Sequence, residues 1–118
     1  MRGIFFAFIL CVSGGTVAAF ERVDDKGRFL DLVADKELRL GLFGVSLHVG
    51  EEGTISGSAA GWDLTGTWAW HDGYFCREID WSGTEISYNC QLVEHRNGER
   101  IRFTVDQGAG RQATFSLR

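Results

Sequence analysis

The stretch that decides the fold is ISYNCQLVEHRNGERIRFTV, residues 86–105. Every second residue is apolar or aromatic over residues 86–92, and the same alternation returns over residues 101–105. Alternation of this kind is typical of a strand that buries one face. Asn97 and Gly98 lie between the two runs, and an Asn-Gly pair is a strong signal for a hairpin turn. This stretch therefore predicts two antiparallel strands joined by a tight turn.

The same period of two recurs over most of the remaining chain. The further alternating runs are residues 38–40, 45–49, 54–60, 64–70, 74–79 and 113–117. Together with the hairpin they give about eight short strands at roughly ten-residue spacing, with no room for crossover helices. The sequence therefore predicts an all-β fold, an antiparallel meander of about eight strands. A small barrel, closed or partly open, is the economical arrangement because closure removes exposed strand edges.

One segment near the N-terminus departs from this pattern. Asp25 is a good helix N-cap, and Phe29, Leu30 and Val33 follow at helical spacing. We expect a short N-terminal helix here.

The first nineteen residues have the layout of a secretory signal peptide. A basic residue, Arg2, precedes an apolar run over residues 4–12, and small residues end the segment at Ala19. The run is too short to span a bilayer, so we expect no stable membrane anchor. Cleavage leaves residues 20–118 as a single β domain that is periplasmic or secreted.

Removal of the signal peptide discards Cys11 and leaves Cys76 and Cys90. In an oxidising compartment these two cysteines are expected to form a disulfide. The bridge would close a 15-residue loop, which corresponds to about 3 kcal/mol of stabilisation. The rival interpretation, a redox or metal-binding pair, needs further ligands at short spacing. The sequence contains no CxxC motif, so we expect no metal.

The charge balance is acidic, with a formal net charge of −4 over the whole chain. Phosphates would be repelled by most of such a surface, so nucleic acid is not an expected partner.

Candidate catalytic residues are sparse. Glu78 and Asp80 lie two apart and would share one side of a strand, as an acid–base pair could. His48, His71 and His95 lie on three separate segments, and the strand register places His48 and His95 outward. Sixteen acids make such carboxylate pairs by chance, so we expect no catalytic residues. We also expect no cofactor.

The tryptophans give the best functional indication. Trp68 and Trp70 share a face with Leu64 and are expected in the core. Trp62 and Trp81 are expected in connections, where a partly exposed indole can contact a ligand at a barrel mouth. With Tyr74 they form the candidate ligand-binding set. The expected partner is a small hydrophobic ligand or an unidentified protein, and we expect the protein to be a monomer.

Residues 53–117 resemble a group of small exported bacterial proteins, some of which carry the name dihydrodipicolinate reductase. The matching residues are Gly61-Trp62, Thr65 to Trp70, Gly73 to Arg77, Asn89 to Glu94 and Arg102 to Thr104. That name implies an NAD(P)H-dependent reductase, whereas the sequence lacks a dinucleotide-binding fingerprint. The expected architecture is also similar to small periplasmic barrels that inhibit metalloproteases with a flexible N-terminal arm, and residues 20–23 would correspond to that arm.

Three functions follow as hypotheses. The first is a non-enzymatic binding or inhibitory module of the cell envelope, which we favour. The second is an enzyme, either the reductase that the resemblance implies or a hydrolase that uses Glu78 and Asp80. The third is a purely structural envelope protein. An open barrel mouth lined by aromatic residues would favour binding, and converging carboxylates in a cleft would favour catalysis.

Overall fold

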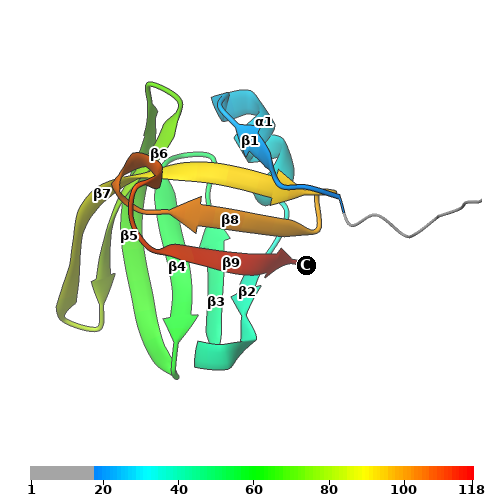
Figure 1. Ribbon diagram of the computed structural model, residues 1–118. Helices are drawn as coiled ribbons and strands as arrows, with labels where there is room; N and C mark the ends of the chain where they lie inside the picture. The colour runs from blue at the N-terminus through cyan, green and yellow to red at the C-terminus, as the bar shows by residue number, and fades with distance from the viewer. Residues whose placement is uncertain (1–17) are drawn as a thin grey trace, which may run out of the picture.

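A computed structural model describes residues 18–118 (Figure 1). Most of the expected signal peptide, residues 1–17, lies outside the described residues. The elements are β1 (Glu21–Val23), α1 (Lys26–Val33), β2 (Leu38–Leu40), the 3-10 turn η1 (Gly41–Phe43), β3 (Val45–Val49), β4 (Thr54–Ala59), β5 (Trp62–His71), β6 (Tyr74–Trp81), β7 (Thr84–Arg96), β8 (Arg100–Thr104), the 3-10 turn η2 (Asp106–Gly108) and β9 (Gln112–Leu117).

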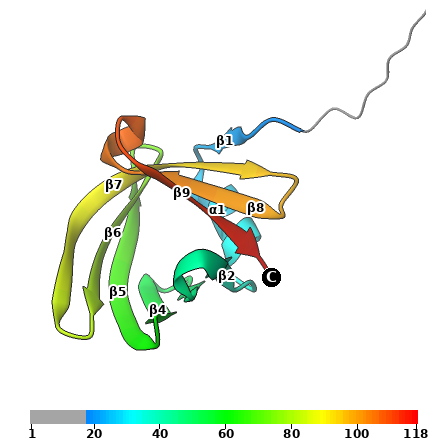
Figure 2. The ribbon, with the colours of Figure 1, turned by 60° about the horizontal axis from the view of Figure 1, so that its bottom comes forward.

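The strands form a closed antiparallel barrel. Each strand from β2 to β9 pairs with the next one along the chain, and β9 pairs back with β2. Figure 2 shows the strands curving round until the sheet closes on itself. β1 lies outside this ring as a ninth strand and pairs with β7. The predicted all-β meander and barrel are therefore confirmed.

Tight turns of two or three residues with left-handed backbone join the long strands. In the β7–β8 hairpin Asn97 and Gly98 have φ of 55° and 67°, as their residue types predict. The β4–β5, β5–β6 and β6–β7 turns also place two successive residues at positive φ, with glycine second; these pairs are Ala60-Gly61, Asp72-Gly73 and Ser82-Gly83. Because these turns are so short, the expectation that Trp62 and Trp81 lie in connections is wrong. Trp62 begins β5 and Trp81 ends β6.

Helix α1 packs on one end of the barrel (Figure 1). Its N-cap is Asp25, whose Oδ2 accepts a 3.0 Å hydrogen bond from the backbone N–H of Arg28, as predicted. The buried side of the helix carries Phe29 and Val33. Phe29 contacts four aromatic rings of the barrel at centroid distances of 5.0 to 6.4 Å, those of Trp68, Trp70, Phe75 and Phe103. An aromatic cluster therefore fills this end of the barrel.

The predicted disulfide is present between β6 and β7. Cys76 and Cys90 are direct partners in the strand register, and their sulfur atoms lie 2.07 Å apart. A disulfide indicates an oxidising, non-cytoplasmic compartment. Within residues 18–118, no helix combines the length and the apolar character needed to cross a membrane.

The register of β7 differs from expectation. β6 and β7 shift register between Arg77 and Ile79, so that Ser87 and Tyr88 have no partner on β6. Beyond this irregularity the residues buried against the barrel interior are Gln91 and Val93. The prediction that His95 projects outward is therefore wrong, because His95 follows the inward alternation of Val93 and its side chain is 15% exposed.

Candidate functional site

The barrel interior contains a cavity of about 370 Å³. It lies beside the aromatic cluster, since Phe75 and Phe103 belong to both. Residues from β2, β3, β4, β6, β7, β8 and β9 line it. The apolar lining residues are Leu38, Leu47, Val49, Ile55, Phe75, Ile79, Ile86, Phe103, Val105, Ala113 and Phe115. A mostly apolar cavity of this size inside an eight-stranded barrel is suited to one small ligand.

Four polar residues complete the lining: Arg77, Gln91, Arg111 and Gln112. Arg77 lies on β6 between two other cavity residues, Phe75 and Ile79, so its side chain leaves the inner face of the strand. Gln91 is the register partner of Phe75 and is 6% exposed. Arg111 precedes β9 and is exposed. The cavity is therefore apolar with a few polar groups, and both of its charges are positive.

Arg77 is held by the strand irregularity described above. Its Nη1 donates a 2.7 Å hydrogen bond to the backbone carbonyl of Ser87 on β7. Burial lowers the pKa of the Arg77 guanidinium from its ordinary value, because removal from water disfavours the charged form. None of the ion pairs within residues 18–118 includes Arg77. A partly buried cation thus lines an apolar cavity without a carboxylate partner from the described chain.

The three predicted ligand-binding aromatics do not line this cavity. Trp62 and Trp81 lie together at the β4–β5 end, where Trp81 Nε1 donates a 3.1 Å hydrogen bond to the carbonyl of Ala59, the register partner of Trp62. Tyr74 lies at the other end of β6, with the Arg22 guanidinium 5.0 Å from its ring centroid. The structure therefore brings two of the three together and separates the third.

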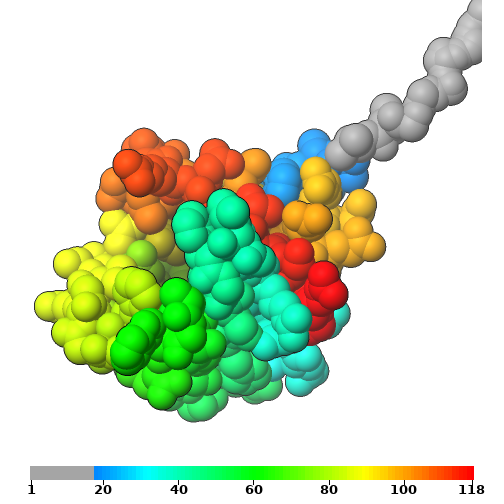
Figure 3. Space-filling view, turned by 90° about the horizontal axis from the view of Figure 1, so that it is seen from below, coloured from blue at the N-terminus to red at the C-terminus, as the bar shows by residue number. Residues whose placement is uncertain are grey.

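Exposed apolar side chains lie on η1 and at the start of β5. Seen from below, the segment around η1 stands forward in the middle of the molecular face (Figure 3). Its Leu42 and Phe43 are 84% and 62% exposed, and Trp62 is 62% exposed. The Phe43 carbonyl accepts a 3.2 Å hydrogen bond from the Ala60 N–H, which joins η1 to the β4–β5 turn. The rim patch, defined as Leu42, Phe43 and Trp62, is separate from the cavity lining.

The carboxylates and histidines considered in the sequence lie elsewhere. Glu78 and Asp80 are exposed on the outer face of β6, where they line an open surface depression together with Glu85, and neither lines the cavity. His48 and His71 are exposed at separate places on β3 and β5. His95 accepts a 3.2 Å hydrogen bond at Nδ1 from the Gly98 N–H. Over residues 18–118 no group of three or more His, Cys, Asp or Glu side chains is placed to hold a metal ion.

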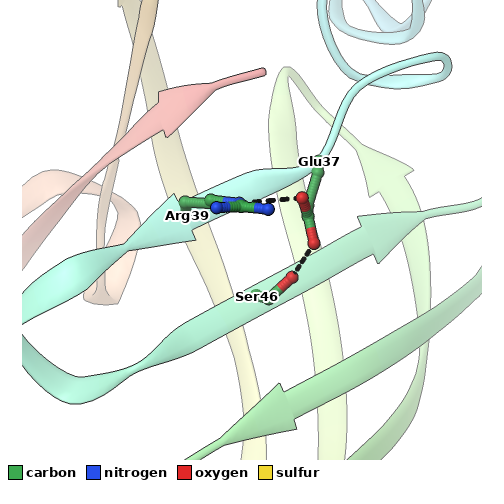
Figure 4. Close-up of polar contacts among 3 residues, drawn as sticks. All are labelled: Glu37, Arg39 and Ser46. Atoms are coloured by element: carbon green, nitrogen blue, oxygen red, sulfur yellow. Dashed lines mark hydrogen bonds and ion pairs between the residues drawn. The ribbon is translucent and has the colours of Figure 1, made fainter.

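A polar network lies where the barrel closes (Figure 4). Glu37 exchanges two backbone hydrogen bonds with Arg118, and its carboxylate accepts hydrogen bonds from Ser46 Oγ on β3 and from Arg39 Nε on β2. The Ser46 hydrogen bond, followed by that from Arg39, lowers the pKa of Glu37 below its ordinary value. This network connects β2 to β3 beside the β2–β9 pairing, and Glu37 does not line the cavity.

Sequence reasoning missed the four polar cavity residues, Arg77, Gln91, Arg111 and Gln112. A signal for Arg77 was available, since it alternates with Phe75 and Ile79 and a charged residue on an apolar face needs an explanation. Comparisons with protein-family models, with curated proteins and with solved structures find no significant match to this chain.

Proposed function

We propose that the protein is an exported binding module of the cell envelope that holds one small hydrophobic ligand inside its barrel. The observation that carries this proposal is the cavity of about 370 Å³ with eleven apolar residues in its wall. Small-molecule sites are concave and largely apolar, with a few polar groups that fix orientation. A barrel that was purely structural would instead fill its interior with side chains.

The chemistry of the lining favours binding over catalysis. Among the described residues, the cavity wall contains no carboxylate, imidazole, thiol, hydroxyl or amine. It therefore supplies no nucleophile and no general base near neutral pH. Glu78 and Asp80, the pair that a hydrolase would need, lie on the outer face of the barrel.

A location in the cell envelope rests on two observations. The Cys76–Cys90 disulfide indicates an oxidising compartment, and the first nineteen residues have the pattern of a signal peptide. We propose that the mature protein begins at Phe20 and acts in the periplasm or outside the cell.

The position of β1 bears on the inhibitory alternative. Residues 21–23 pair with β7, Val23 is fully buried, and the Phe20 ring lies 4.0 Å from the Arg102 guanidinium carbon. An arm that enters a protease would have to leave these contacts and expose Val23. Ligand binding needs no such rearrangement, which supports the binding function.

The reductase alternative needs a site for the cofactor pyrophosphate at a helix N-terminus. Helix α1 begins after Asp24 and Asp25, and the Asp25 side chain already accepts a hydrogen bond from one of the free N–H groups. Two carboxylates at this position would repel a pyrophosphate. We expect no NADH or NADPH binding at millimolar concentration.

The test uses N-phenyl-1-naphthylamine, a probe whose fluorescence rises in apolar sites. Ala113 lines the cavity on β9, so A113F should occupy the space and weaken probe binding about tenfold or more. Thr114, the next residue, does not line the cavity, so T114F adds the same ring to the other face of β9. We expect T114F to bind the probe as the wild type does.

Two results would overturn the proposal: a wild type that does not bind the probe saturably, or equal binding by A113F and T114F. Thermal unfolding monitors whether each variant is folded. V105F, which also adds a ring to the cavity wall, replaces A113F if that variant is unfolded.

A further inference from the structure

We propose that the ligand carries a carboxylate head group and that Arg77 binds this group inside the barrel. The inference rests on the proposed function and specifies its ligand class: an amphiphile with a carboxylate at one end and an alkyl chain or apolar ring at the other. The observations that carry it are the sign of the charge in the cavity, the fixed position of Arg77, and the apolar wall from the neighbouring strands.

The charge inside the cavity is opposite to that of the protein. The chain has a formal net charge of −4, yet the cavity wall contains two arginines and no acid. Sixteen acids were available to neutralise Arg77, and none of the ion pairs within residues 18–118 reaches it. A partly buried cation is unfavourable unless it is paired, so an anionic ligand supplies the missing partner.

Arg77 is also held in place for this role. Its hydrogen bond to the Ser87 carbonyl uses Nη1 and anchors the guanidinium to the irregular part of β7. A guanidinium has five N–H donors in a planar fork that matches the two oxygens of a carboxylate. Gln91, on the neighbouring strand β7, also lines the cavity. Its side-chain amide offers a further N–H donor.

The remaining wall is suited to the apolar part of the ligand. β2, β3 and β4 contribute only aliphatic side chains to the cavity, namely Leu38, Leu47, Val49 and Ile55. The polar lining residues come instead from β6, β7 and the start of β9. A molecule with one charged and one apolar end satisfies both parts of the lining.

Calorimetric titration with decanoic acid and with 1-decanol separates the contribution of the head group to binding affinity from that of the alkyl chain. The wild type should bind decanoate more tightly than decanol. In R77Q, decanoate affinity should fall about tenfold or more, since a hydrogen bond to a charged group is lost, while decanol affinity stays within about twofold. R77K should retain part of the decanoate affinity, because the charge remains and the bidentate fork is lost. R100Q, at an exposed arginine of β8 that does not line the cavity, is the matched control and should leave decanoate affinity within about twofold of the wild type.

Each outcome decides one of the two proposals. Equal weakening of both ligands by R77Q, or no weakening of either, overturns the role of Arg77. Binding of decanol with decanoate no tighter than decanol retains the apolar cavity function and overturns the carboxylate assignment. A wild type that binds neither ligand overturns both proposals. Thermal unfolding of R77Q in the absence of ligand verifies that the variant is folded.

Discussion

Arg77 Nη1 lies 2.7 Å from the carbonyl oxygen of Ser87, across the register irregularity between β6 and β7. This contact holds a positive charge in the wall of an otherwise apolar cavity. Burial lowers the pKa of the Arg77 guanidinium, which means that the charged form is less favourable here than in water. Residues retained for binding commonly reduce stability in this way.

Replacement of Arg77 by methionine should therefore stabilise the unliganded protein. Methionine fills much of the same volume with apolar atoms and carries no charge, so we expect the free energy of unfolding to rise. Urea unfolding of R77M and wild type measures the change, with R111M at the exposed arginine as the control. A loss of stability in R77M would show that Arg77 is a structural residue.

Removal of the disulfide should lower stability by about 3 kcal/mol, since Cys76 and Cys90 close a 15-residue loop in the unfolded chain. The double variant C76A/C90A should unfold at a lower urea concentration than the wild type. Addition of a reductant should lower the midpoint of the wild type and leave that of the double variant unchanged. Equal midpoints for the oxidised wild type and the double variant would contradict a stabilising role.

The docking of α1 depends on one side chain. Phe29 is fully buried among four aromatic rings, so F29A should cost about 3–5 kcal/mol of unfolding free energy. F43A removes the same atoms at a residue that is 62% exposed and should change stability by less than about 0.5 kcal/mol. Thermal or urea unfolding compares the two variants. Similar losses in both would mean that the aromatic cluster does not hold the helix.

The Glu37 network predicts a pH dependence. The pKa of Glu37 is below its ordinary value of 4.5 in the folded protein, first because Ser46 donates a hydrogen bond to the carboxylate. The stabilisation is therefore fully present above pH 4.5 and is lost as the pH falls through the folded-state pKa. In S46A the pKa of Glu37 should rise toward 4.5, as measured by NMR titration of the carboxyl carbon. Glu52, whose pKa is lowered by Thr54 instead, is the internal control and should titrate unchanged.

The strands and turns were predictable because they depend on local signals. Asn97 and Gly98 adopt the left-handed conformation that their residue types favour, and Asp25 caps α1. The helix itself was predictable from this cap together with the helical spacing of Phe29, Leu30 and Val33.

The inner face of β7 was not predictable in the same way. Leu92 continues the apolar alternation of Cys90, yet it lies outside the barrel, where η2 covers it and Gly108 approaches its side chain. A strand with apolar residues on both faces gives no unique inside face. The cavity was hidden for a related reason, since its volume depends on side chains from seven strands rather than on any one segment.

Amide and arginine side-chain chemical shifts in NMR spectra locate bound decanoate on the protein and so test whether Arg77 binds its carboxylate. We predict the largest shifts at the Arg77 Nε–H and at the backbone amides of Phe75, Gln91 and Ala113, all from the cavity wall. The ligand methyl group should show contacts to the aliphatic wall of β3 and β4. Shifts confined to the rim patch, with the Arg77 signal unchanged, would show that the ligand binds outside the barrel and not at Arg77.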